Sequence, residues 1–149
     1  YKIAVMKSRL STVMTNVKAI KNSAEMYYLI NGRYLSDDIN ELDIEIAACT
    51  KSEGGLMSCP DTNTSYNYNG NAPSNPSQRY EVIGYWPAYL PTSDGNKFWQ
   101  IAYTMVLDKA QSGNGKRYCS ANPLNYNETA EKVCRSMGGK PAGTYNWEL

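Results

Sequence analysis

Four cysteines carry the most distinctive chemistry in this sequence. They form two well-separated couples, Cys49 with Cys59 and Cys119 with Cys134, and neither couple has the C-x-x-C spacing of a redox motif or a zinc knuckle. The chain contains no histidine, so a zinc site would need all four thiolates to be brought together from two distant regions. We therefore predict disulfides and no metal site.

The cysteines allow three disulfide connectivities. Pairing Cys49 with Cys59 and Cys119 with Cys134 would close two short loops, each worth roughly 3 kcal/mol in the chain-entropy estimate. The other two connectivities would tie the region around residues 49–59 to the tail, and they remain open. Any of the three predicts an oxidising compartment outside the cytoplasm.

The sequence does not indicate an enzyme or a bound cofactor. Without histidine it lacks the commonest general base and the usual partner of a serine or cysteine nucleophile. Acids such as Glu81 and Asp108 are present, but their spacing marks no catalytic pair. Asp94, Asn96 and Asp108 are oxygen ligands that would suggest calcium, yet they do not have the spacing of an EF-hand. We interpret Asp94 and Asn96 as turn residues.

Length and charge narrow the class of protein further. A chain of 149 residues fits a single domain, and we predict one unit over 1–149. The 15 basic and 14 acidic side chains leave a formal charge of +1, which indicates neither a nucleic-acid partner nor an anionic membrane surface. No apolar run approaches the ~20 residues of a membrane span.

Residues 1–30 have the pattern of one long amphipathic helix. No proline or glycine interrupts them, and Asn31-Gly32 follows as a helix end. At 1.5 Å per residue the helix would be about 45 Å long, more than a domain of this size needs, so part of it should project or contact a partner. Apolar residues recur at spacings of three and four and form one stripe: Ile3, Met6, Leu10, Val13, Val17, Ile20, Ala24 and Tyr27.

Charge is unevenly distributed along this region. Residues 1–30 hold five basic side chains and one acid, whereas residues 31–48 hold five acids and one arginine. Two solvated faces would explain this pattern. Complementary pairing between stacked subunits would explain it as well, and such pairing would set register more than affinity.

The remainder of the chain predicts a loop followed by a sheet. Residues 31–63 are expected to connect helix and sheet, with a turn at 37–42. Strand candidates rich in Tyr, Val, Ile, Trp or Thr lie at 65–69, 79–86 and 97–107, with a fourth at 117–120. Loops are expected at 71–77 and 90–96. Because no helix separates the strands, they predict an antiparallel meander within 64–120.

The tail, residues 119–149, predicts a disulfide-bounded loop that contains a short helix. Asn125 and Glu128 have the spacing of a capping box. A helical face and a helix end follow, marked by Ala130, Val133, Met137 and Gly138-Gly139. The predicted fold class is therefore α+β, with the long N-terminal amphipathic helix packed on an antiparallel β-sheet meander.

The first third of the chain resembles a known family. Its sequence is similar to the segment after the hydrophobic half of the long N-terminal helix in type IV pilins and type II secretion pseudopilins. The resemblance implies that Tyr1 corresponds to the tyrosine of a Pro-Gln-Tyr at the end of an apolar stretch, which this sequence lacks together with its acidic assembly residue. The similar runs are YKIAV (1–5), KSR (7–9), AEMYYL (24–29), NGRY (31–34) and LDI (42–44).

The resemblance implies a pilin-like fold and a filament subunit that is not an enzyme. Its partners would be identical or related pilin subunits, and it would meet a membrane only through the missing N-terminal segment. The precursor would have a methylated N-terminus. The subunit would reside in the inner membrane with its domain facing the bacterial periplasm, and then in an extracellular or cell-surface filament for adhesion, motility or DNA uptake. The loop between Cys119 and Cys134 is similar to the disulfide-bounded region of many pilins.

The resemblance also divides the apolar stripe into two parts. The part nearest the N-terminus would continue the filament core as an assembly interface, formed by Ile3, Met6, Leu10 and Val13. The following part would pack on the sheet of the same domain, through Val17, Ile20, Ala24, Tyr27 and Tyr28.

Two other functions remain open. The first is a major pseudopilin of a type II secretion system, although that class commonly has a calcium-binding loop in place of the C-terminal bridge. The second is a surface carbohydrate-binding module, because exposed aromatic rings offer flat apolar faces with polar rims. The same aromatic residues would otherwise be core or cross-strand pairs: Tyr85, Trp86, Tyr89, Trp99 and Trp147.

Overall fold

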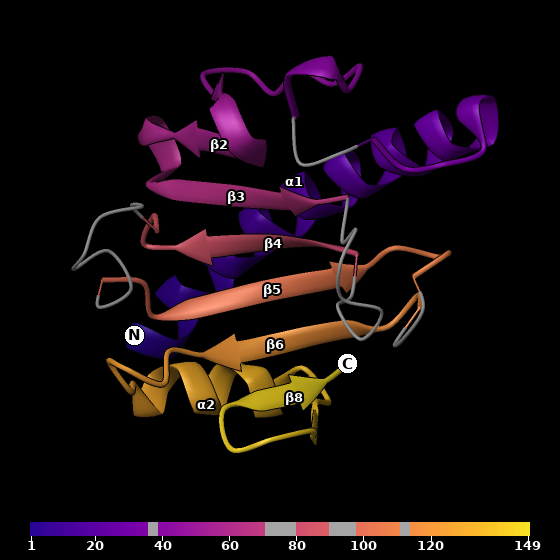
Figure 1. Ribbon diagram of the computed structural model, residues 1–149. Helices are drawn as coiled ribbons and strands as arrows, with labels where there is room; N and C mark the ends of the chain where they lie inside the picture. Colours follow the sequence, from indigo (N-terminus) through magenta and orange to yellow (C-terminus); the bar gives the residue numbers. More distant parts are fainter. Residues whose placement is uncertain (36–38, 71–79, 90–97, 111–113) are drawn as a thin grey trace.

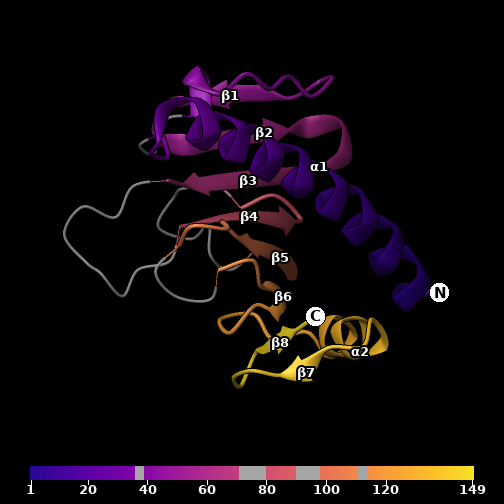
Figure 2. The same cartoon turned by 90° about the vertical axis from the view of Figure 1, so that its right-hand side faces the viewer.

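One long helix crosses one face of an antiparallel sheet in the computed structural model, which describes residues 1–35, 39–70, 80–89, 98–110 and 114–149. The helix α1 spans Lys2–Asn31, and the sheet has eight strands (Figure 1). A second, short helix, α2, covers the same side of the sheet near the beginning of α1 (Figure 2). The predicted α+β class, with a long N-terminal helix packed on an antiparallel sheet, is confirmed.

The sheet is a meander over its first six strands, because each pairs antiparallel with the next in the chain. The strand order is β1-β2-β3-β4-β5-β6-β8-β7. The strands are β1 (Thr50–Ser52), β2 (Leu56–Cys59), β3 (Thr64–Asn69), β4 (Glu81–Trp86), β5 (Ile101–Val106), β6 (Arg117–Ala121), β7 (Lys140–Pro141) and β8 (Asn146–Glu148). The four predicted strands correspond to β3, β4, β5 and β6.

The sheet extends further than the sequence predicts. Strands β1 and β2 lie within residues 31–63, where only a connecting loop was expected, and β7 and β8 lie in the tail. These four strands have two to four residues each, too few to show an alternating pattern. Three short 3₁₀ turns accompany them: η1 (Ile39–Glu41), η2 (Glu53–Gly55) and η3 (Pro60–Thr62). The predicted turn at 37–42 thus contains η1, while the loops predicted at 71–77 and 90–96 lie outside the described residues.

The helix α2 spans Glu128–Ser136 and begins two residues later than the predicted capping box allows. Its N-cap is Asn127, whose side-chain oxygen accepts a hydrogen bond from the Thr129 amide at 2.8 Å. The prediction of Asn125 as the cap was wrong. An asparagine side chain caps a helix only when it directly precedes the first turn, and Asn127 holds that place.

The core lies between α1 and the middle strands of the sheet, mainly β4 and β5. The helix approaches closely at Gly84 on β4, where a Cβ atom would lie 2.5 Å from Val13 Cγ1 and 2.8 Å from Val17 Cγ2. The helix ends as predicted at Gly32, which has a φ of 71° and donates its amide proton to the Tyr28 carbonyl at 2.7 Å. Among the described residues, no helix is both long enough and apolar enough to cross a membrane.

Candidate functional site

The sheet-facing side of α1 is buried along nearly its whole length. Met6, Leu10 and Val13, expected to contact other subunits, are 3%, 1% and 0% exposed inside the domain's own core. The assembly interface predicted for these three residues is therefore wrong, because α2 extends the covered area to the first turns of α1. Only Ile3 of that set is exposed. The helix–sheet packing set is placed as predicted: Val17, Ile20 and Ala24 are buried, and Tyr27 and Tyr28 are half-buried against the same core.

A second apolar surface lies near the C-terminal end of α1, and the sequence pattern did not reveal it. Met26, Leu29 and Ile30 are 57%, 77% and 77% exposed. These three residues do not belong to the apolar stripe predicted from the sequence. Their exposure follows from the structure, which shows that the stripe faces the sheet. An apolar cluster on a helix side that the domain leaves uncovered is a candidate contact surface.

Met26 and Ile30 form part of a groove, which we call the helix-end groove. It has a volume of about 550 Å³ and runs between the last turns of α1 and the segment that follows η1. This segment contributes Ile44 and the exposed carboxylates of Asp43 and Glu45, and the last residue of η1 contributes a third exposed carboxylate, Glu41. The full lining is Ala19, Asn22, Ser23, Met26, Tyr27, Ile30, Glu41, Asp43, Ile44 and Glu45.

The opposite end of α1 is basic. Lys2, Lys7 and Arg9 are exposed around its first turns, with Ile3 and Lys7 on one side of the helix and Lys2 and Arg9 on another. We call the N-terminal end formed by these four residues the basic face. Within the described part of the chain, none of these three cations has an ion-pair partner. The same holds for the three carboxylates of the helix-end groove. One end of the helix thus carries unpaired cations, and the other carries three unpaired carboxylates together with the exposed Arg33.

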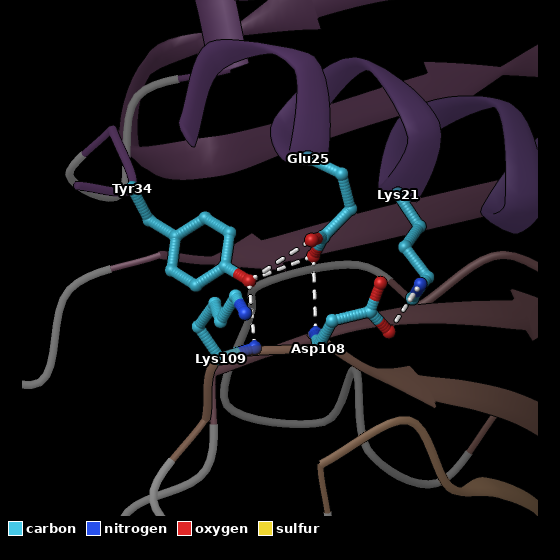
Figure 3. A network of polar contacts seen from close by, with 5 residues as sticks. All are labelled: Lys21, Glu25, Tyr34, Asp108 and Lys109. Carbon is cyan, nitrogen blue, oxygen red and sulfur yellow. Dashed lines mark hydrogen bonds and ion pairs between the residues drawn. The ribbon is translucent and has the colours of Figure 1, made fainter. Parts of the chain in front are cut away.

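A polar network anchors the C-terminal half of α1 to the rest of the domain (Figure 3). The Lys21 ammonium pairs with the Asp108 carboxylate at 2.9 Å, while Glu25 accepts hydrogen bonds from the Tyr34 hydroxyl at 2.8 Å and the Asp108 amide at 3.1 Å. The Tyr34 oxygen in turn accepts from the Lys109 amide at 2.9 Å. Burial, reinforced by the Glu25 carboxylate, raises the pKa of Tyr34 above its ordinary value, so the hydroxyl remains a donor. The network therefore fixes the position of the groove-forming end of α1.

Asp108, considered from the sequence as a calcium ligand, takes part in this network. Its carboxylate faces Lys21, and the other two oxygen ligands considered with it, Asp94 and Asn96, lie outside the described residues. In the described ranges there is no group of three His, Cys, Asp or Glu side chains that could hold a metal ion.

All four cysteines form disulfides. The bridges are Cys49–Cys59 and Cys119–Cys134, the two short-loop pairings, with sequence separations of 10 and 15. The first ties the chain before β1 to the end of β2, and the second ties β6 to α2. The structure thereby selects one of the three connectivities that the sequence left open.

The aromatic residues divide between the two faces of the sheet. Tyr85, Tyr89 and Trp99 cluster on the face away from α1, with the Tyr85 ring centroid 5.2 Å from each of the other two. Trp147 is buried in the core, and Trp86 lines a cavity of about 180 Å³ beside the beginning of α1. Trp99 is only 9% exposed, so the clustered rings mainly cover one another.

The aromatic cluster adjoins an open groove of about 230 Å³ over β4, β5 and β6. Its polar lining includes Glu81, Thr104, Ser120 and Asn146, and its apolar lining includes Ile83. Burial raises the pKa of Tyr85 to about 12, so this phenol remains neutral at physiological pH. The groove thus places aromatic rings next to hydroxyl, amide and carboxylate groups.

Comparison with known proteins adds no relative to this description. No protein-family model matches the chain, no curated protein matches it, and no solved structure matches it.

Proposed function

We propose that this chain is a structural subunit of a type IV pilus-like filament and that it assembles through its N-terminal helix. The observation that carries the proposal is the uncovered side of α1. A rod about 45 Å long packs one side on the sheet and leaves apolar residues, including Leu29 and Ile30, exposed on the other. A filament of like subunits would bury this side.

The assembly surface in this proposal differs from the one expected from the sequence. Met6, Leu10 and Val13 already belong to the domain's own core, so the outer side of α1, with the exposed apolar residues near its C-terminal end, would face neighbouring subunits. The two disulfides support exposure to an oxidising environment, in keeping with a subunit that passes from the inner membrane to a cell-surface filament.

The C-terminal bridge favours a pilin over a pseudopilin within the same proposal. Cys119–Cys134 ties β6 to α2, and the resemblance associates such a bridge with pilins. Thermal unfolding of the chain with calcium and with a chelator separates the two classes. We expect equal midpoints; a midpoint raised by calcium would favour the pseudopilin.

The test of the filament proposal uses the native host. Antibodies raised against this chain should label filaments sheared from the cell surface, and deletion of the gene should remove those filaments. Complementation with the double variant Leu29→Gln/Ile30→Gln should reduce the number of filaments, whereas the control Leu124→Gln, at an exposed position outside α1, should not. Absence of labelled filaments from wild-type cells would refute the proposal.

A second candidate, binding of surface carbohydrate, is favoured by the groove beside Tyr85 and Trp99. A glycan array probed with the chain tests it directly. Binding that is lost in Tyr85→Ala and retained in Tyr118→Ala would support the candidate. Absence of binding by the wild-type chain, or equal binding by both variants, would exclude the candidate.

A further inference from the structure

We propose that copies of this chain associate head to tail, with the basic face of one copy docked on the helix-end groove of the next. This inference rests on the proposed filament function and specifies which surfaces of neighbouring subunits meet. It commits to a second copy of this chain as the occupant of the groove. Three features support it: the charges of the two surfaces, their separation, and their apolar residues.

The charges of the two surfaces are equal in number and opposite in sign. Lys2, Lys7 and Arg9 are exposed on the basic face, and three carboxylates are exposed at the groove. Two cations offset part of the acidic charge at this end of the helix: the exposed Arg33, and Lys51, whose ammonium donates to the Leu42 carbonyl at 2.9 Å. The acids of α2 near the basic face form ion pairs within their own helix, so they do not neutralise it. Complementary charges therefore remain for an external partner.

The two surfaces cannot meet within one copy. They lie at opposite ends of a 30-residue helix, so they are separated by most of its length of about 45 Å. Figure 2 shows the beginning of α1 near α2 and its end near β1 and β2. The surfaces also differ from each other, so a contact between copies is heterologous and extends into an open chain unless it closes into a ring. The position of the charges alone thus favours a linear assembly.

Apolar residues occur on both surfaces. Ile3 lies one helical turn from Lys7 on the same side of α1, so an apolar side chain and a cation project together. In the groove, Met26 and Ile30 are likewise one turn apart, and Ile44 faces them from the following segment. Ile3 would enter this apolar part while Lys7, on the same side of the helix, meets the carboxylates at its rim. The apolar contact would supply affinity, and the charges would select the register.

The test is a charge exchange between two variants of the chain. The acidic-face variant carries Lys2→Glu, Lys7→Glu and Arg9→Glu, and the basic-groove variant carries Glu41→Lys, Asp43→Lys and Glu45→Lys. Sedimentation velocity at low salt, with chain concentrations up to about 1 mM, measures self-association at the weak end of specific binding. We expect wild-type chains to associate, and each variant alone to associate about tenfold more weakly, because reversal of the charges replaces attraction between exposed groups by repulsion.

An equal mixture of the two variants provides the decisive measurement. Each acidic face then meets a basic groove and each basic face an acidic groove, so the mixture should recover wild-type association. At about 1 M salt, where the screening length is about 3 Å, the differences between the samples should disappear. Lys140→Glu, on β7 outside both surfaces, is the control and should behave as wild type. Circular dichroism and thermal unfolding confirm that each variant is folded.

Several outcomes would overturn the inference. Wild-type chains that remain monomeric at low salt would do so, as would variants that associate like wild type or a mixture that fails to recover. The same variants introduced into the native gene distinguish this inference from the filament proposal. If filaments persist unchanged in both variants, the filament proposal stands and the head-to-tail contact is wrong. If wild-type cells carry no labelled filaments, the filament proposal itself fails.

Discussion

The two sides of α1 differ in burial although they belong to one continuous helix. The sheet-facing side buries Leu10, Val13 and Val17 in the domain core, whereas the outer side leaves Leu29 and Ile30 in solvent. Burial of apolar area contributes stability to the isolated chain only on the first side. On the second side the same kind of residue can contribute only when another molecule covers it. Apolar character alone therefore does not identify a core position in a long helix.

The largest expected difference in stability is between substitutions of two leucines on opposite sides of the helix. Leu10→Ala removes a buried side chain and should lower the free energy of unfolding by about 2–5 kcal/mol. Leu29→Ala, the same substitution on the exposed side, should change it by at most about 0.5 kcal/mol. Urea unfolding followed by circular dichroism measures both. Equal losses would show that the two sides are not distinct.

A smaller effect is expected where the sheet-facing side comes closest to the strands. Gly84→Ala places a methyl group 2.5 Å from Val13 Cγ1, so the helix must shift, at a cost of about 1–3 kcal/mol. The matched substitution Gly143→Ala meets nothing nearer than 3.4 Å and should change stability by only a few tenths of a kcal/mol. Thermal unfolding of both variants provides the comparison. A neutral Gly84→Ala would mean that the helix sits further from β4 than described.

The smallest effect concerns Tyr34, whose hydrogen bonds anchor α1 to the turn after β5. Tyr34→Phe removes the hydroxyl that donates to Glu25 and accepts from the Lys109 amide, so it should destabilise the domain by about 1–2 kcal/mol at neutral pH. The control Tyr1→Phe changes a fully exposed tyrosine and should be neutral. Denaturant unfolding at neutral pH distinguishes the two variants.

Alkaline pH should also change the difference in stability between wild type and Tyr34→Phe. The pKa of Tyr34 is raised in the folded state, so above pH ~10 the unfolded chain loses this proton while the folded chain keeps it. The unfolded state then binds fewer protons, and stability falls as pH increases. Tyr66 and Tyr85, whose pKa values are also raised by burial, contribute to the same decline. Tyr34→Phe should therefore lose less stability between pH 9 and about 11 than wild type; an equal loss would exclude Tyr34 as a contributor.

Local signals were sufficient for the long elements and insufficient for the short ones. The helix follows from its apolar period and from Gly32, and β3 to β6 follow from runs rich in aromatic and β-branched residues. Strands such as β1 and β7 are too short for any pattern, and they exist because a neighbouring strand offers hydrogen-bonding partners. The Lys21–Asp108 pair joins residues 87 positions apart, a distance over which sequence spacing carries no signal.

The sequence by itself determined that residues 1–30 form a helix, that one stripe of it is apolar, and that the cysteines favour disulfides. Only the tertiary structure decided what covers that stripe. The apolar periodicity predicts which residues of the helix are buried. It does not predict what buries them, because the sheet, α2 or another subunit would each remove the side chain from water. Met6, Leu10 and Val13 are buried in the core of their own domain. The exposed apolar residues near the C-terminal end of α1 lie on its outer side, which no apolar period marks.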